Sequence, residues 1–118
     1  KHNGFLRKED LAAYHPEWVD PISVNYHGYD VWELPPNGHG ITVLMALQIL
    51  KDMDLGARDD VETLHKQIEA MKLAMTDTAN YVAEPSYMKV TVEELLSEEY
   101  REDGIFVRAW VPKEFHYM

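Results

Sequence analysis

Six histidines are the residues of this chain that most readily suggest chemistry, because imidazole binds metals and transfers protons near neutral pH. They are His2, His15, His27, His39, His65 and His116. No two of them have the short spacing of zinc ligands, and the patterns His-x-x-x-His and His-Glu-x-x-His are absent. His27 and His39 are expected to be turn or cap residues. The sequence therefore predicts no metal site and no cofactor.

Adjacent acidic residues are the next candidates, because two carboxylates can share acid–base work. Examples are Asp59–Asp60, Glu93–Glu94 and Glu98–Glu99. Neighbouring side chains on a helix point about 100° apart, so they do not converge on one substrate atom. These residues are expected to cap helix N-termini and to cover solvated faces.

Serine and threonine hydroxyls become nucleophiles when a base lies beside them. Ser23, Ser86 and Ser97 have no suggestive sequence neighbours, and no Gly-x-Ser-x-Gly turn occurs. The threonines, which are Thr42, Thr63, Thr76, Thr78 and Thr91, are all internal, and residue 1 is Lys1. Cysteine is absent, which excludes a disulfide, a thiolate metal site and a cysteine nucleophile. The sequence predicts no catalytic residue and assigns no substrate-binding residue.

The loop from Pro35 to Gly40 lacks the Gly-x-x-x-x-Gly-Lys pattern of a phosphate-binding loop, and no lysine or arginine accompanies it. Its glycines are expected to let the end of a strand approach the start of a helix closely. Anion binding at the N-terminus of that helix is the alternative, because free N–H groups attract negative charge there.

The composition is that of an ordinary globular domain, with 118 residues of which 46% are hydrophobic and 27% charged. The formal net charge of −10 argues against nucleic acid and anionic membranes as partners, because both require clustered cations. No apolar run approaches the ~20 residues that span a bilayer. The chain begins with Lys1, so the lack of a signal peptide says little about a longer parent protein.

The first half of the chain predicts a short helix and a hairpin. The helix covers residues 7–14 and is stopped by His15-Pro16. An apolar patch of Trp18, Val19 and Ile22 follows. Residues 22–34 form the hairpin, with a His27-Gly28 turn that places Tyr26 opposite Tyr29 and Val24 opposite Val31. Both hairpin faces carry apolar residues, which predicts that the hairpin lies between two layers.

The second half predicts three helices and a strand. Residues 41–53 are apolar nearly all round and should be buried on several sides. A second helix, capped by Asp59 or Asp60, should bury the residues that recur at steps of three and four, namely Val61, Leu64, Ile68, Met71, Met75, Ala79 and Val82. The methionines are expected in the core rather than on an adaptable binding surface. Thr91 and Glu94 form a capping box for a third helix to residue 100, and residues 105–111 suggest a strand.

Five segments carry a resemblance in their order and spacing. They are Gly4-Phe5-Leu6 with Glu9-Asp10-Leu11-Ala12-Ala13-Tyr14, Pro21-Ile22 with Tyr26-x-Gly28-Tyr29, Pro35-Pro36 with Gly40, Leu47-Gln48-Ile49-Leu50 with Asp54-Leu55, and His65, Glu69, Ala70, Lys72 and Ala74. Together, over residues 3–100, they resemble the late part of the large subunit of the γ-glutamyltransferase family (γ-glutamyltranspeptidase, glutathione hydrolase). The sequence departs from the family pattern at Thr76-Asp77-Thr78, where Ala-Asp-Arg is usual, so an arginine-dependent contact is lost, and at Ala83-Glu84-Pro85, where Gly-Asp-Pro is usual.

The resemblance implies a parent enzyme of the N-terminal-nucleophile hydrolase class, which cuts itself into a large and a small subunit. A threonine at the new N-terminus would attack the γ-glutamyl amide, with its own amine as the base. That threonine and the other groups that bind substrate would lie outside this stretch. The implied partners are the remainder of the large subunit and the small catalytic subunit, and a periplasmic or extracellular location would fit.

These observations predict an α+β fold, a fragment of an N-terminal-nucleophile hydrolase scaffold with one β-hairpin, two long helices and short flanking helices. Residues 1–118 would form one partial domain, with the tail 101–118 unaligned. The expected function is a structural segment, inactive alone, of an enzyme that cleaves γ-glutamyl amides such as glutathione and transfers the glutamyl group to water or amino acids.

The alternative is a stand-alone, non-catalytic module that self-associates through its apolar helix. Residues 41–53 carry about eight large apolar side chains, each worth ~1.5–3 kcal/mol when buried. Leaving half of them exposed would forfeit ~6–12 kcal/mol, which is comparable to the whole stability of a domain. The isolated chain is therefore expected to self-associate or to be loosely packed.

Overall fold

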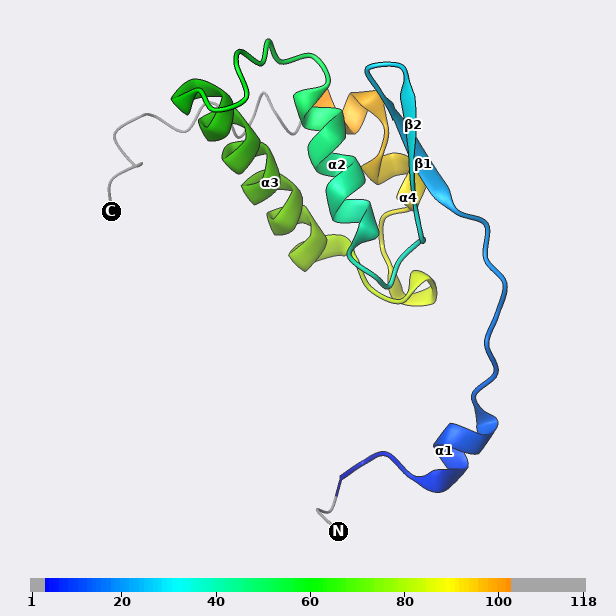
Figure 1. Cartoon of the computed structure of the whole chain (residues 1–118). Helices are drawn as coiled ribbons and strands as arrows, with labels where there is room; N and C mark the ends of the chain where they lie inside the picture. Colours follow the sequence, from blue (N-terminus) through cyan, green and yellow to red (C-terminus); the bar gives the residue numbers. More distant parts are fainter. Residues whose placement is uncertain (1–3, 103–118) are drawn as a thin grey trace.

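The computed structural model describes residues 4–102 and shows a small α+β unit (Figure 1). In chain order its elements are α1 (Lys8–Ala13), β1 (Ile22–Tyr26), β2 (Tyr29–Glu33), α2 (Gly40–Leu50), α3 (Val61–Tyr81), the short 3₁₀ helix η1 (Pro85–Tyr87) and α4 (Val92–Leu95). Helix α2 lies in the middle, with α3 on one side and the hairpin on the other. The predicted fold class is confirmed: one hairpin, two long helices and short flanking helices.

The hairpin forms as the sequence predicts, down to its register. Tyr26 lies opposite Tyr29 and Val24 opposite Val31 in an antiparallel pair. His27 and Gly28 make the turn with φ of 50° and 88°, the left-handed conformation that suits the right-handed twist of two joined strands. The backbone N–H of Gly28 also donates a hydrogen bond to the Asn25 side chain at 3.1 Å.

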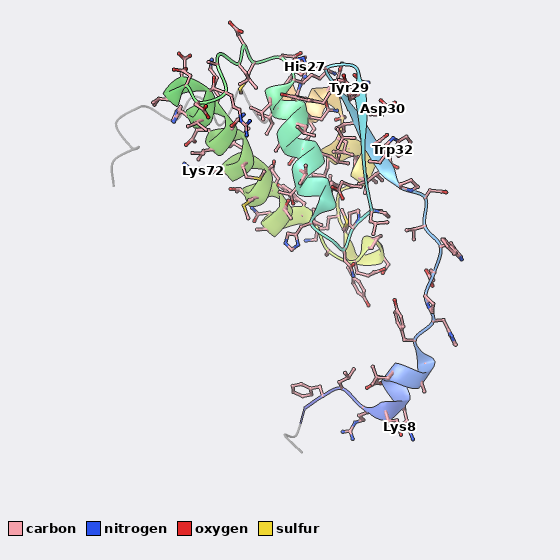
Figure 2. The ribbon with its side chains drawn as sticks, viewed as in Figure 1. Lys8, His27, Tyr29, Asp30, Trp32 and Lys72 are labelled. Atoms are coloured by element: carbon pink, nitrogen blue, oxygen red, sulfur yellow. The ribbon has the colours of Figure 1, made fainter. Side chains whose placement is uncertain are left out.

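Only one face of the hairpin is covered by the described residues. Val24 is buried against α2, and Ile22 packs on the same core. On the opposite face Trp32 and Leu34 remain 59% and 68% exposed, and Figure 2 shows Trp32 directed away from α2. The prediction that the hairpin lies between two layers is therefore not met within residues 4–102.

Helix α2 is the centre of the core. Its buried residues are Ile41, Thr42, Leu44, Met45, Ala46 and Leu50, and they contact α3, the hairpin and the segment after α3. The helix ends three residues before the predicted Met53, because the Met53 N–H bonds the carbonyl of Leu50 and tightens the chain into a turn. The prediction that this helix is buried on several sides is confirmed, since Val43, at 39%, is its only exposed residue.

Helix α3 turns a different face to the core from the one predicted. Asp60 is its N-cap residue, as expected, although its side chain makes no capping hydrogen bond. The buried positions are Thr63, Ala70, Ala74, Asp77 and Thr78. The large apolar residues expected in the core, Val61, Leu64, Ile68, Met71 and Met75, are exposed instead. Small residues allow α3 to approach close to α2, whose own side chains are bulky, because the distance between helices depends on the side chains at the contact.

The segment after α3 packs on the core and covers part of it. Leu95 is buried, with Val82, Met88, Val90, Val92, Leu96 and Tyr100 packed around the same cluster. The single helix predicted to residue 100 is broken: α4 ends at Leu95, and residues 98–102 are helical again. Ser97 explains the break, since its hydroxyl accepts a hydrogen bond from the Tyr100 N–H and so caps a new helix start. The predicted strand at 105–111 lies outside the described residues.

The N-terminal arm, residues 4–21, extends away from this unit and has every residue exposed (Figure 1). It contains α1, at the place predicted, and none of the residues of that helix is buried. Of the predicted apolar patch, Ile22 packs on the core, whereas Trp18 and Val19 are exposed. No helix within residues 4–102 is long and apolar enough to cross a membrane.

Candidate functional site

The described histidines are distributed singly over the structure. His15 lies on the arm, His27 in the hairpin turn, His39 before α2 and His65 on α3. His27 contacts its neighbour Tyr26 edge to face, with 4.4 Å between the ring centres. Within residues 4–102 no group of three His, Cys, Asp or Glu side chains could hold a metal ion. His2 and His116 lie outside the described residues.

The acidic pairs do not converge, and several members serve as caps or ion-pair partners. Asp60 occupies the N-cap position of α3, and Glu98 forms a salt bridge with Lys51 at 3.1 Å. Glu94 completes the predicted capping box with Thr91, whose backbone N–H donates to the Glu94 carboxylate at 2.7 Å. This backbone bond, followed by the bond from the Thr91 hydroxyl, lowers the pKa of Glu94 below its ordinary value of 4.5.

Glu94→Gln is expected to lower stability at neutral pH and to have less effect in acid. A carboxyl whose pKa is lowered by folding stabilises the fold above its unfolded pKa, and that contribution is lost as the pH falls through the folded pKa. The difference from the wild type should therefore shrink below pH 4.5. Urea denaturation across this range would measure it. Glu93→Gln removes the same charge from the same turn, so an equal pH-dependent difference in that control would contradict the assignment.

Ser23 lies in strand β1, whereas Ser86 and Ser97 are held in local turns. The Ser86 hydroxyl donates a hydrogen bond to Glu84, and the Ser86 N–H bonds the same carboxylate at 3.0 Å. Glu84 is the N-cap of η1, so this neighbour, which sequence reasoning missed, has a capping role. The signal was present in Glu84-Pro85-Ser86, a carboxylate followed by a helix-starting proline. Ser97 donates to the carbonyl of Glu94.

Two threonines meet in the interior between α2 and α3. The hydroxyls of Thr42 and Thr78 are 2.7 Å apart, and both residues are buried. Thr78 uses its single proton to bond the carbonyl of Ala74 at 2.8 Å, so Thr42 is the donor in the pair. Thr78, where the resemblance implies an arginine, here joins two helices. Neither hydroxyl is available as a nucleophile in this arrangement.

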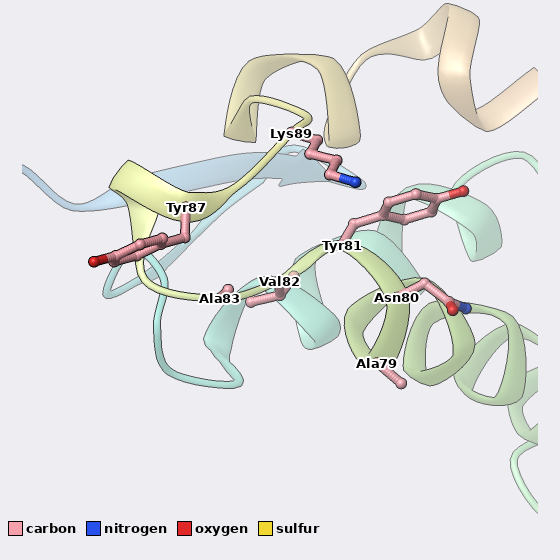
Figure 3. Close-up of a pocket in the computed structure, with 7 residues that line it drawn as sticks. All are labelled: Ala79, Asn80, Tyr81, Val82, Ala83, Tyr87 and Lys89. Carbon is pink, nitrogen blue, oxygen red and sulfur yellow. The ribbon is translucent and has the colours of Figure 1, made fainter.

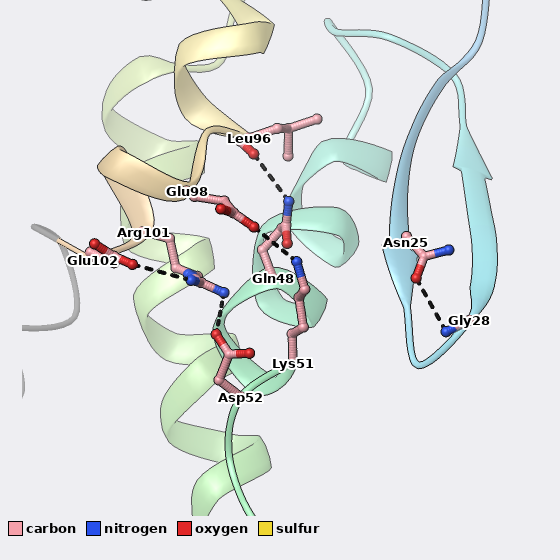
Figure 4. Close-up of polar contacts among 9 residues, drawn as sticks. All are labelled: Asn25, Gly28, Gln48, Lys51, Asp52, Leu96, Glu98, Arg101 and Glu102. Atoms are coloured by element: carbon pink, nitrogen blue, oxygen red, sulfur yellow. Dashed lines mark hydrogen bonds and ion pairs between the residues drawn. The ribbon is translucent and has the colours of Figure 1, made fainter.

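A polar cluster fastens residues 96–102 to the end of α2 (Figure 4). The Gln48 side chain donates to the carbonyl of Leu96 at 3.1 Å, and Lys51 pairs with Glu98. Arg101, whose side chain is only 10% exposed, forms an ion pair with Asp52. Sequence reasoning assigned no role to Arg101, because a residue that pairs with a loop so distant in sequence gives no local signal.

An open cavity of about 450 Å³ lies at the C-terminal end of α3 (Figure 3). Its lining residues are Ala79, Asn80, Tyr81, Val82, Ala83, Tyr87 and Lys89. Lys89 extends toward the side of Tyr81, whereas Tyr87 lies at the opposite end. The lysine and the asparagine amide offer hydrogen-bond donors, and the described lining includes no carboxylate, histidine, serine or threonine.

The arrangement of hairpin and helices recurs in two solved structures of longer chains. Cephalosporin acylase from Bacillus halodurans matches with a TM-score of 0.82 and 58% identity, over 87% of this chain and 19% of that one. The γ-glutamyltranspeptidase of Helicobacter pylori matches with a TM-score of 0.77 and 26% identity, over 88% of this chain and 31% of that one. The fold is therefore a part of the N-terminal-nucleophile hydrolase fold.

The model of the gamma-glutamyltranspeptidase family matches residues 1–105. The chain belongs to this family, which confirms the resemblance stated from its motifs. A glutathione hydrolase-like proenzyme, YwrD, from Bacillus subtilis is 32% identical over 103 residues. The glutathione hydrolase proenzyme of Escherichia coli is 35% identical over 106 residues. The matched parts are 85% of this chain but 20% and 18% of those proteins, so the chain spans about a fifth of their length.

Proposed function

We propose that this chain is a scaffold segment of a γ-glutamyltransferase-like enzyme, one that cleaves γ-glutamyl amides such as glutathione and passes the glutamyl group to water or an amino acid. The family match over residues 1–105 carries the proposal. It is supported by the length of the relatives, which are proenzymes about five times as long as the part they share with this chain.

In this proposal the chain supports the structure of the enzyme and supplies no reacting group. Several of the described hydroxyls and carboxylates are engaged in caps, turns and interhelical bonds, as Thr42, Ser86 and Glu94 illustrate. The nucleophile, by family resemblance a threonine freed by self-cleavage, would come from the small subunit. The chain would bring the buried α2 and its two flanking layers to that subunit as a preformed unit.

An acylase is the second candidate for the parent enzyme. The 58% identity to the cephalosporin acylase of Bacillus halodurans is well above the 35% identity to the glutathione hydrolase of Escherichia coli. Both reactions break an amide through an acyl-enzyme, so the same scaffold serves either. Assays of a longer enzyme that contains this segment, with γ-glutamyl-p-nitroanilide and with a cephalosporin, would separate the two.

The alternative function, a stand-alone module that self-associates through α2, is not favoured, because the chain itself covers most of that helix. Self-association of the isolated chain stays a prediction. Its source would be the apolar side chains that the structure leaves exposed on the arm, on the outer hairpin face and on α3.

The purified chain is expected not to hydrolyse γ-glutamyl-p-nitroanilide. The physical reason is that the described hydroxyls in contact with a carboxylate, those of Ser86 and Thr91, are engaged with Glu84 and Glu94 in caps at helix N-termini. Release of p-nitroaniline would be followed spectroscopically, with a heat-inactivated sample as the blank and the Escherichia coli glutathione hydrolase as the positive control. Turnover above the blank that purifies with the chain would refute the proposal that its chemistry is supplied from elsewhere.

A further inference from the structure

Five large apolar side chains lie in one exposed row on α3. They are Val61, Leu64, Ile68, Met71 and Met75, and each is between 38% and 80% exposed. We call this row the outer stripe of α3. A contiguous apolar surface of this kind marks an interaction site, whereas scattered single residues do not.

The spacing of the outer stripe is that of a helix-pairing seam. Its members follow one another at steps of three, four, three and four residues, the repeat that places every side chain of the row against a neighbouring helix. Val61 and Ile68 lie seven residues apart, as the a positions of a heptad do. Leu64 and Met71 are also seven apart, as its d positions are. Period alone would not distinguish this seam from a core face, but the core face of α3 is already occupied by Ala70 and Ala74 against α2. Helix α3 thus has two faces suited to packing, and of these the described residues cover only the one against α2.

We propose that the outer stripe of α3 is the docking surface for an apolar helix in the remaining part of the longer enzyme. The inference rests on the proposed function, which makes the chain a segment of that enzyme. It adds that the contact lies on α3, that a helix of the longer enzyme makes it, and which residues of this chain take part.

The number and separation of the exposed apolar surfaces favour the rest of a longer chain over a second copy of this one. The outer stripe lies on α3, whereas Trp32 and Leu34 lie on the hairpin, on the other side of α2 (Figure 1). The arm adds further exposed side chains, among them Phe5 and Trp18. A two-fold dimer covers one self-complementary patch on each copy. Protein chain amounting to about four fifths of each relative lies outside the matched part and is large enough to cover all three surfaces.

The test is a graft into the acylase of Bacillus halodurans, whose matching part shares 58% identity with this chain. This chain replaces that part of the acylase, with Ile68→Asp as the variant and Thr76→Asp as the matched control. Both substitutions place a carboxylate at an exposed position of α3, but only Ile68 belongs to the outer stripe. The measurements are the yield of soluble, self-cleaved enzyme, its cephalosporin acylase activity and its mass by light scattering.

Ile68→Asp is expected to reduce the yield of cleaved, active chimera by more than about tenfold, because the charge would be buried in an apolar seam. Thr76→Asp should leave the yield within about twofold. In the ungrafted 118-residue chain both variants should melt close to the wild type, since both side chains are exposed there.

Three outcomes would overturn the inference in different ways. If the chimera tolerates Ile68→Asp as well as Thr76→Asp, the outer stripe is not a docking surface, although the scaffold role stands. If the unsubstituted chimera fails to assemble while the acylase itself succeeds, the proposed function fails and the inference falls with it. If the chimera is a dimer that Ile68→Asp converts to an active monomer, the occupant is a second copy.

Discussion

Leu44→Ala is expected to lower the free energy of unfolding by ~2–5 kcal/mol, the range for truncating a fully buried leucine. Leu44 has no exposed surface, and it lies on α2 between the hairpin and α3. A small domain is stable by only ~5–15 kcal/mol, so this one change should remove a large part of the total. Part of the loss comes from transferring fewer apolar atoms out of water, and the remainder from the cavity left behind.

Val43→Ala is the matched control, because it truncates the preceding residue of the same helix. Val43 is 39% exposed, so its truncation should lower the free energy of unfolding by less than about 1.5 kcal/mol, the low end of the value for fully burying an apolar side chain. Urea denaturation followed by far-ultraviolet circular dichroism would give both values. Equal losses at the two positions would mean that α2 presents a different face to the core.

The hairpin could be predicted residue by residue because the information that determines it is local. A two-residue turn fixes the register of both strands, and Gly28 accepts the positive φ that such a turn requires. The capping box at Thr91 and Glu94 was predictable for the same reason, since its bonds join residues three apart. The break at Ser97 was missed, although it is also local, because a serine that ends one helix and begins the next resembles a helix interior in sequence.

The buried face of α3 could not be predicted, because apolar periodicity indicates that a face is covered without indicating what covers it. In a complete domain the apolar stripe would be the inner face. Here the inner face is made of alanine and threonine with one buried aspartate, Asp77, and Ala74 and Thr78 are buried against α2 because they are small. The apolar stripe remains exposed, which agrees with the proposal that it docks against the rest of a longer enzyme.

For the candidate site, too, local features could be predicted from the sequence and long-range contacts could not. Sequence reasoning rejected the histidines and the acidic pairs from their spacing, and the structure places them apart or in caps. The Thr42–Thr78 bond and the Arg101–Asp52 ion pair join residues far apart in sequence, and neither has a local signature. Such pairs depend on how α2 packs against its neighbours, which the pattern of one chain does not specify.

Gly40→Ala is expected to destabilise the fold by ~1–3 kcal/mol, the usual cost of forcing extra atoms into a packed site. A Cβ at Gly40 would lie 2.7 Å from the Glu33 carboxylate and 2.9 Å from the Glu33 Cβ. The carboxylate can rotate away, but the Cβ is fixed by strand β2. Gly40 is the first residue of α2 and follows the loop after β2, so the hairpin and the helix would have to separate. The intrinsic preference of helices for alanine over glycine opposes this cost by up to about 1 kcal/mol and is smaller at a helix end.

Gly38→Ala supplies the control within the same loop. A Cβ at Gly38 would meet no atom within 4 Å, so its effect should stay within about 0.5 kcal/mol, as at other open surface positions. Thermal and urea denaturation of the two variants would test the prediction that a glycine of this loop allows close approach of strand and helix. If both variants were as stable as the wild type, Glu33 would have to move freely, and the contact between β2 and α2 would not be rigid. If Gly38→Ala alone were destabilising, the close approach would have been assigned to the wrong glycine.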